Sequence, residues 1–322
     1  MEYRKVGKWG LRLSELSLGS WVTFGRQLDL SGVKAIMHRA FDAGITFFDT
    51  AEAYNYGVAE YLMGQVLKEF NRMDYVVSTK IFWWGIGSRE RNQIGLSKKH
   101  IIEGLTASLK RLQLDYVDIV YCHRPDPETP LEEVISGIEY VLRQGMALYW
   151  GTSEWSAELI SEASKLAREI GILPPIVEQP QYNMLVRERV EKEYAPLYED
   201  PGIGLTTFSP LASGVLTGKY NEGIPKGSRL DLMPELRKHL EESGILSEKT
   251  FEKLRKLQKI ADSLGAKLSQ LAIAWVLKNE HVTSVILGVS KLEQLEENLK
   301  ALEIKERLTE DIMREIDEVL SE

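Results

Sequence analysis

Several short apolar or β-branched runs each end in, or are followed by, a polar residue. These residues are Asp49, Lys80, His123, Ser153 and Gln179. Taken singly, a strand-end Asp, Lys or His usually has a structural role as a helix cap, a solvated charge or a satisfied buried group. In a parallel barrel, however, the ends of successive strands face one mouth. The five side chains are therefore expected to share a site.

Tyr54 follows Asp49 closely enough for its ring to reach back over that site. A phenol ordinarily titrates near pKa ~10, which is high for an acid at neutral pH. A neighbouring Lys80 ammonium would lower that pKa, and Asp49 would hold the ammonium through an ion pair. His123 could orient a carbonyl oxygen. None of these side chains can supply hydride, so the set predicts carbonyl reduction by a nicotinamide cofactor.

The elements that must position these residues alternate along the chain. Strand-like runs end near Leu18, Asp49, Lys80, His123, Thr152, Gln179, Phe208 and Leu287. Helical spacing and helix-ending signals occupy residues 31–43, 97–111, 131–144 and 156–170 between them. Because parallel strands need crossover connections, the repeat predicts an α/β fold, a (β/α)8 TIM barrel. An open doubly wound sheet is the alternative.

Three segments lie outside this repeat. Residues Tyr3–Val6 and Leu11–Leu13 predict a β-hairpin at the bottom of the barrel. The long interval after Phe208 holds a Gly-rich loop over Ser209–Gly227 and additional helices, and a loop of that length is usually functional. The last helix is expected over Thr309–Leu320. No composition break divides the chain, so residues 1–322 are expected to form a single domain.

Composition narrows the classes of function. The 322 residues are 43% hydrophobic and carry a net charge of −8, which disfavours binding to nucleic acid or an anionic membrane and favours a small-molecule partner. The lone Cys122 and the charged start at Met1–Gly10 predict a cytoplasmic protein without direct membrane insertion. None of the five histidines has metal-ligand spacing, so no metal is expected.

The usual dinucleotide fingerprint is absent, because Gly85–Gly87 and Gly202–Gly204 both lack the third glycine. Two other segments could bind phosphate. Ser209–Gly214, with Lys219 and Arg229 beyond it, offers backbone donors and positive charge. Gly288–Lys291 opens a helix after the last strand, and helix N-termini bind phosphates.

With these residues and motifs considered together, the chain resembles the aldo-keto reductase superfamily. It resembles most of all the branch that contains the β subunits of voltage-gated potassium channels. The resemblance runs almost end to end. The stretches that carry it are Gly19–Gly25, Phe48–Tyr54, Gly95–Pro130, Gln144–Ser153 and Leu271–Trp275.

The resemblance implies a catalytic tetrad of Asp49, Tyr54, Lys80 and His123, and NADPH as the cofactor. The implied cofactor contacts are Gly19, Ser20, Trp21, Gln27, Asp49, Ser153, Gln179, Phe208, Ser209, Pro210, Leu211, Ser213, Gly214, Lys219, Arg229, Gly288, Ser290, Gln294, Glu297 and Asn298. Among these, Ser153 and Gln179 would hold the nicotinamide carboxamide. Gln294 stands where many members have arginine, which weakens the implied preference for NADPH over NADH. NADH remains the less favoured alternative.

Two rival functions are considered beside an aldehyde or ketone reductase. Lys80 could act as a Schiff-base nucleophile in a lyase, although Asp49 would oppose this by stabilising the ammonium. The chain could instead bind NADPH as a redox-sensing subunit of a membrane channel, with little turnover. The channel branch usually has asparagine at the position of His123. The histidine in this chain resembles the ordinary reductases and therefore favours an enzyme.

The substrate is expected to be a small aldehyde or ketone. Trp21, Trp83 and Trp84 follow strand ends and predict an aromatic wall, together with Tyr54 and His123. The resemblance is compatible with a homo-oligomer, a tetramer or larger.

Overall fold

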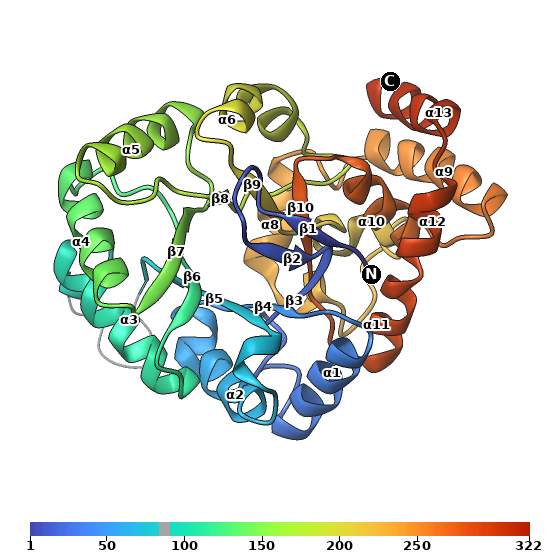
Figure 1. Cartoon of the computed structure of the whole chain (residues 1–322). Helices are drawn as coiled ribbons and strands as arrows, with labels where there is room; N and C mark the ends of the chain where they lie inside the picture. Colours follow the sequence, from blue (N-terminus) through green and yellow to red (C-terminus); the bar gives the residue numbers. More distant parts are fainter. Residues whose placement is uncertain (84–90) are drawn as a thin grey trace. The chain divides into compact units, whose positions relative to one another are not determined.

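The computed structural model describes residues 1–83 and 91–322, and its central feature is a closed barrel of eight parallel strands (Figure 1). In spatial order the strands are β10-β3-β4-β5-β6-β7-β8-β9. Their bounds are β3 Leu16–Gly19, β4 Phe47–Asp49, β5 Val76–Ile81, β6 Val117–Cys122, β7 Ala147–Thr152, β8 Val177–Glu178, β9 Gly204–Thr207 and β10 Val282–Leu287. The prediction of a TIM barrel is confirmed, and the open sheet is wrong because β10 pairs with β3 and closes the ring.

The N-terminal hairpin, β1 (Tyr3–Lys5) and β2 (Arg12–Ser14), packs on the barrel as predicted. Its Val6 and Leu13 are fully buried in one cluster with barrel residues that include Phe47 and Ile119. Gly7 turns with φ +54°, and a Cβ there would lie 2.2 Å from the carbonyl oxygen of Gly202. The glycines of the 202–204 segment therefore serve close packing against the hairpin.

The chain contains two compact units, each described here by itself. The first comprises residues 1–180, 188–207 and 281–292, and it contains the whole barrel. Its helices are α1 Leu30–Asp42, α2 Val58–Leu67, α3 Lys98–Leu112, α4 Leu131–Arg143, α5 Ala157–Glu169 and α6 Ala195–Glu199, with short helical turns η1 Tyr54–Gly57, η2 Arg72–Asp74, η3 Arg91–Gln93 and η4 Arg189–Glu193.

Capping explains where the helices of this unit begin. The side chains of Asp29, Ser97 and Ser156 accept hydrogen bonds from backbone N–H groups in the first turns of α1, α3 and α5. These starts agree with the predicted ones. Helix α2 was not predicted, because its short sequence is buried on most sides and lacks an amphipathic stripe.

The second unit comprises residues 181–187, 208–280 and 293–322. Its helices are η5 Ala212–Thr217, α7 Arg229–Leu232, α8 Pro234–Glu242, α9 Glu248–Ser263, α10 Leu268–Lys278, α11 Leu292–Leu299, α12 Ala301–Arg307 and α13 Glu310–Ser321. Helix α10 is buried over most of its length and packs against α9 and α12. That all 322 residues form a single domain stays a prediction.

No single helix in the described ranges is long and apolar enough to cross a membrane. Helices α9 and α10 meet the length and composition criteria only together, as a pair bent by 87°.

Candidate active site

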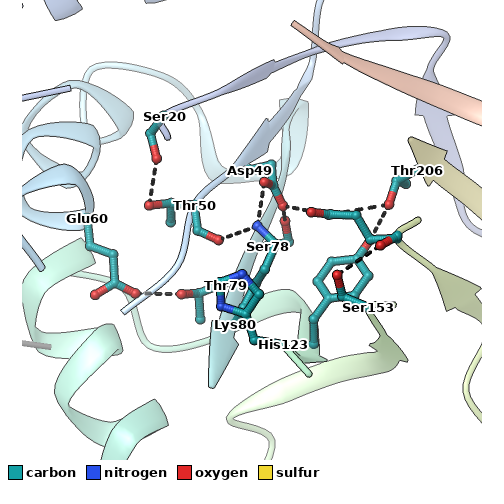
Figure 2. Close-up of polar contacts among 12 residues, drawn as sticks. Ser20, Asp49, Thr50, Glu60, Ser78, Thr79, Lys80, His123, Ser153 and Thr206 are labelled. Atoms are coloured by element: carbon teal, nitrogen blue, oxygen red, sulfur yellow. Dashed lines mark hydrogen bonds and ion pairs between the residues drawn. The ribbon is translucent and has the colours of Figure 1, made fainter. Parts of the chain in front are cut away.

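A buried ion pair joins the ends of β4 and β5 (Figure 2). The Lys80 ammonium donates to Asp49 Oδ2 over 2.5 Å, and the two side chains are 0% and 3% exposed. Ser78 Oγ donates to the other carboxylate oxygen, Oδ1, at 2.7 Å. The register of the barrel makes this contact possible, because Asp49 pairs directly with Ser78 across the two strands.

Lys80 has a second acceptor, the backbone carbonyl of Thr50, at 2.9 Å. The Thr50 hydroxyl in turn accepts from Ser20 at 2.9 Å. Burial by itself lowers the pKa of Lys80, but its interactions with Asp49 and Tyr54 outweigh burial and raise that pKa above the usual lysine value. Lys80 is therefore an ammonium at neutral pH.

Tyr54 begins the short turn η1, whose backbone is unusual. Asn55 and Tyr56 have φ values of +49° and +54°, in the left-handed region that asparagine tolerates but that costs a residue such as tyrosine about 1–2 kcal/mol. Gly25 leaves room for this turn, since a Cβ there would lie 2.5 Å from Asn55 Nδ2. Strained residues that persist beside a site are a common means of aiming a side chain.

The turn brings the Tyr54 ring to its predicted neighbours. Its centre lies 4.9 Å from the Lys80 ammonium and 5.7 Å from the centre of the His123 ring, which it meets edge to face. Burial raises the pKa of the phenol, and the charge and hydrogen bond of Lys80 lower it by less. The expectation of a lowered pKa is thus wrong in its net direction, because desolvation of the phenolate outweighs the ammonium.

His123 lies at the end of β6 and is 5% exposed. Burial and the positive charges of Lys80 and Arg124 hold its pKa well below the usual histidine range, so the imidazole is neutral. Its Nδ1 is buried and has no hydrogen-bond partner within residues 1–83 and 91–322. A neutral imidazole with an unsatisfied nitrogen is suited to hydrogen bonding with a ligand oxygen.

Ser153 and Gln179 are connected to this group by a hydrogen-bond network. Ser153 Oγ donates to the backbone carbonyl of Gln179 at 2.8 Å, and Gln179 Nε2 donates to Asp49 Oδ1 at 3.1 Å. The network continues through Thr206 Oγ1, 3.5 Å from Gln179 Nε2 and 2.8 Å from the Tyr121 hydroxyl. The structure thus brings together all five strand-end residues named from the sequence.

Arg124 is a member of this region that the sequence reasoning missed. One guanidinium nitrogen, Nη1, donates to the His123 carbonyl at 2.5 Å and to Ser153 Oγ at 3.2 Å. Its guanidinium carbon lies 5.6 Å from the centre of the Trp83 ring. The signal was available, because Arg124 directly follows His123 in the loop after β6.

The residues expected in the aromatic wall have different positions. Trp83 packs edge to face on His123, with ring centres 4.8 Å apart. Trp21 is 40% exposed in the loop after β3. Trp84 lies outside the described residues.

The remaining predicted cofactor residues divide between the two units. Gly19 ends β3, Gln27 is exposed in the following loop, and Gly288 and Ser290 lie between β10 and α11, all in the first unit. Those in the second unit are Phe208, Ser209, Pro210, Leu211, Ser213, Gly214, Lys219, Arg229, Gln294, Glu297 and Asn298.

Two features within the second unit bear on these residues. Gly214, with φ +97°, leaves space for Lys219, whose ammonium would lie 2.9 Å from a Cβ at that position. Glu297 accepts a hydrogen bond from Ser269 Oγ at 3.0 Å and pairs with Lys267. Their assignment to a cofactor stays a prediction.

In the described part of the chain, no group of three or more His, Cys, Asp or Glu side chains is placed to hold a metal ion.

A closed parallel barrel with Asp49, Lys80 and His123 at the carboxyl ends of its strands has the architecture of a (β/α)8-barrel enzyme. The sequence matches the Aldo/keto reductase family over residues 15–321. The chain belongs to that family, which confirms the resemblance. The family supports oxidoreductase activity, typically with NADP(H) and small carbonyl substrates.

Curated relatives cover nearly the whole chain. Proteins named as probable voltage-gated potassium channel subunit beta, from Oryza sativa subsp. japonica and Arabidopsis thaliana, are each 51% identical over 323 residues, which is 99% of this chain and 97% of the relative. A putative voltage-gated potassium channel subunit beta from Schizosaccharomyces pombe is 47% identical over 99% of this chain and 93% of its own.

Proposed function

We propose that the protein reduces aldehydes or ketones to alcohols with hydride from NADPH, and that Tyr54 is the general acid. The observation that carries this proposal is the buried Lys80 ammonium, which contacts Asp49 on one side and lies 4.9 Å from the Tyr54 ring on the other. Such a charge does little for a resting phenol but stabilises the phenolate that forms when the proton leaves.

The residues present suit a nicotinamide. The Ser153 hydroxyl and the Gln179 amide are buried polar groups beside Asp49, and they would hold the carboxamide. NADPH would supply the hydride when bound. NADH is the less favoured alternative.

The chain's own groups would then act on the carbonyl oxygen. Tyr54 stays protonated at neutral pH because burial raises the pKa of its phenol. It would transfer its Oη proton to the carbonyl oxygen as negative charge develops there, and Lys80 would stabilise the resulting phenolate. Neutral His123, through its ring nitrogen, would orient that oxygen by a hydrogen bond.

The lyase alternative is disfavoured by the state of Lys80. An amine must be neutral to attack a carbonyl, and the interactions with Asp49 and Tyr54 raise the pKa of Lys80. Borohydride added with a carbonyl substrate is expected to leave no adduct on Lys80. A trapped adduct would support the lyase instead.

A second candidate function is a redox-sensing subunit that binds NADPH, docks on a membrane channel and turns over slowly. The names of the relatives favour it. We infer that His123 favours turnover instead, since a neutral imidazole beside Tyr54 is equipped to bind a substrate oxygen. For either function, we propose a cytoplasmic location and assembly into a homo-oligomer, a tetramer or larger.

The discriminating experiment measures NADPH consumption with a panel of aldehydes and ketones, for the protein and for Tyr54→Phe. General acid catalysis contributes about 10²- to 10⁴-fold, so kcat should fall by that factor while the Kd for NADPH is unchanged. Tyr56→Phe is the matched control, because this phenol is 49% exposed in the same turn. Full activity in Tyr54→Phe would refute the proposed acid; tight NADPH binding without turnover on any carbonyl would favour the sensor.

A further inference from the structure

Arg124 presents positive charge beside the candidate site without a carboxylate partner. It is half-buried, and no carboxylate oxygen lies within 4.0 Å of its guanidinium in the ranges that the structure describes. Comparable arginines are paired: Arg72 with Asp118 at 2.8 Å and Arg111 with Glu60 at 2.5 Å. A partly desolvated cation without an anion is costly, so the exception needs a reason.

Two carboxylates of this part of the chain, one at the site and one two residues after Arg124, are already engaged. Asp49 binds Lys80, and Asp126 accepts from Leu96 N–H and from Thr129 Oγ1, both at 2.7 Å. The charge of Arg124 also acts on the site, since it helps to lower the pKa of both His123 and Tyr54. Within the described residues, no carboxylate is therefore left to balance the charge of Arg124.

Two nitrogens of the guanidinium are free of hydrogen bonds to the described residues and could bind an anion. Its Nη1 makes both hydrogen bonds, to the His123 carbonyl and to Ser153 Oγ, and its plane lies near the Trp83 ring. The other two nitrogens, Nε and Nη2, make no hydrogen bond to residues 1–83 or 91–322. Anchored at one nitrogen, Arg124 offers the remaining pair in the fork geometry that binds a carboxylate through both oxygens.

We propose that Arg124 binds a carboxylate carried by the substrate, and that the preferred substrates are aldehydes or ketones with an acidic group beyond the carbonyl. This inference rests on the proposed carbonyl reduction. The reacting oxygen would lie at Tyr54 and His123, and the carboxylate at Arg124, so that two points would fix the orientation of the substrate. Trp83, which contacts both His123 and Arg124, would cover the segment between them.

The test compares 4-carboxybenzaldehyde with 4-nitrobenzaldehyde, whose substituents are both planar but differ in charge. For Arg124→Gln, the ratio of the two kcat/KM values, acid over nitro, should fall about 10- to 100-fold, the effect of one lost charge-assisted contact. Any general disturbance of His123 or Ser153 affects both substrates and cancels in the ratio. Arg143→Gln, an exposed arginine on α4, removes the same charge elsewhere and should leave the ratio unchanged.

An unchanged ratio in Arg124→Gln would overturn the proposal. A tenfold weaker Kd for NADPH together with an unchanged ratio would assign Arg124 to the cofactor and not to the substrate. A binding arm separates this inference from the proposed function: calorimetry of 4-(hydroxymethyl)benzoate with the NADP+-loaded protein requires no turnover. Loss of that binding in Arg124→Gln supports the carboxylate site even where no aldehyde is reduced, and equal binding in both proteins refutes it.

Discussion

The buried Asp49–Lys80 pair makes a quantitative prediction about stability. Asp49→Asn removes the counter-ion of Lys80, whose side chain is 0% exposed. The backbone carbonyl of Thr50 is then the remaining hydrogen-bond acceptor of the ammonium among the contacts described above. Lys80→Met leaves the carboxylate with Ser78 and Gln179. Removing one partner of a buried pair costs about 3–5 kcal/mol, because the other charge stays desolvated. Each single variant should lose that much free energy of unfolding.

The double variant Asp49→Asn/Lys80→Met should lose less than the sum of the two singles, by about 2 kcal/mol or more, since neither charge is left alone. Urea titrations followed by tryptophan fluorescence provide the four free energies. Lys110→Met, at an exposed position, is the control and should change the free energy of unfolding by no more than about 0.5 kcal/mol.

The pH dependence of Asp49→Asn makes the test sharper. In the native protein the pKa of Lys80 is raised, so its contribution is fully present below the unfolded value of ~10.4 and is lost only as pH rises through the higher folded value. Without Asp49, burial would bring the folded pKa below the unfolded one. The variant would then gain stability as pH rises between those two values, and its deficit should shrink from pH 7 to pH 9.5. A constant deficit together with additive single variants would refute the buried-ammonium argument.

Two further predictions concern the buried carboxyl groups of Glu178 and Glu52. Burial raises the pKa of Glu178 to about 8, so its neutral form contributes stability that is complete below about pH 4.5 and is lost as pH rises through about 8. Glu178→Gln should remove that slope from the thermal unfolding profile; an unaltered slope would exclude Glu178 as its source. Gly104→Ala should destabilise the protein by about 1–3 kcal/mol in urea, although alanine normally favours a helix, because the new Cβ would lie 2.9 Å from the buried carboxylate of Glu52. A stabilised variant would show that this carboxylate can move.

Helix bounds and strand ends show how far local reasoning reaches. The predicted helix over residues 97–111 occupies 98–112, with Ser97 as its cap, because capping and apolar spacing act within a few residues. Helix α2 escaped prediction because its residues Val58–Leu67 are buried against neighbours on several sides, which leaves no polar face to mark the period.

The pKa of Tyr54 and the contacts of Arg124 could be read only from the folded chain. The sequence supports a Lys80–Tyr54 neighbourhood, but the net pKa depends on how much water the fold removes from the phenol, and there burial outweighs the ammonium. Likewise, an arginine after a strand end is ordinarily solvated or paired. That it has no carboxylate partner among the described residues, while Asp49 and Asp126 bind other groups, is seen only in the folded chain.

By itself, the sequence determined the alternation of strands and helices and the shared strand-end position of Asp49, Lys80 and His123, whereas closure of the barrel rests on the β10–β3 pairing in the tertiary structure. The alternation follows from local periodicity, and the shared position follows from the rule that parallel strands end together. The tertiary structure alone decided the electrostatics of that mouth, including a raised phenol pKa, a neutral imidazole and an unbalanced guanidinium. The reason is physical: desolvation and charge pairing depend on distances of a few ångströms between residues far apart in the chain, and no local pattern specifies those distances.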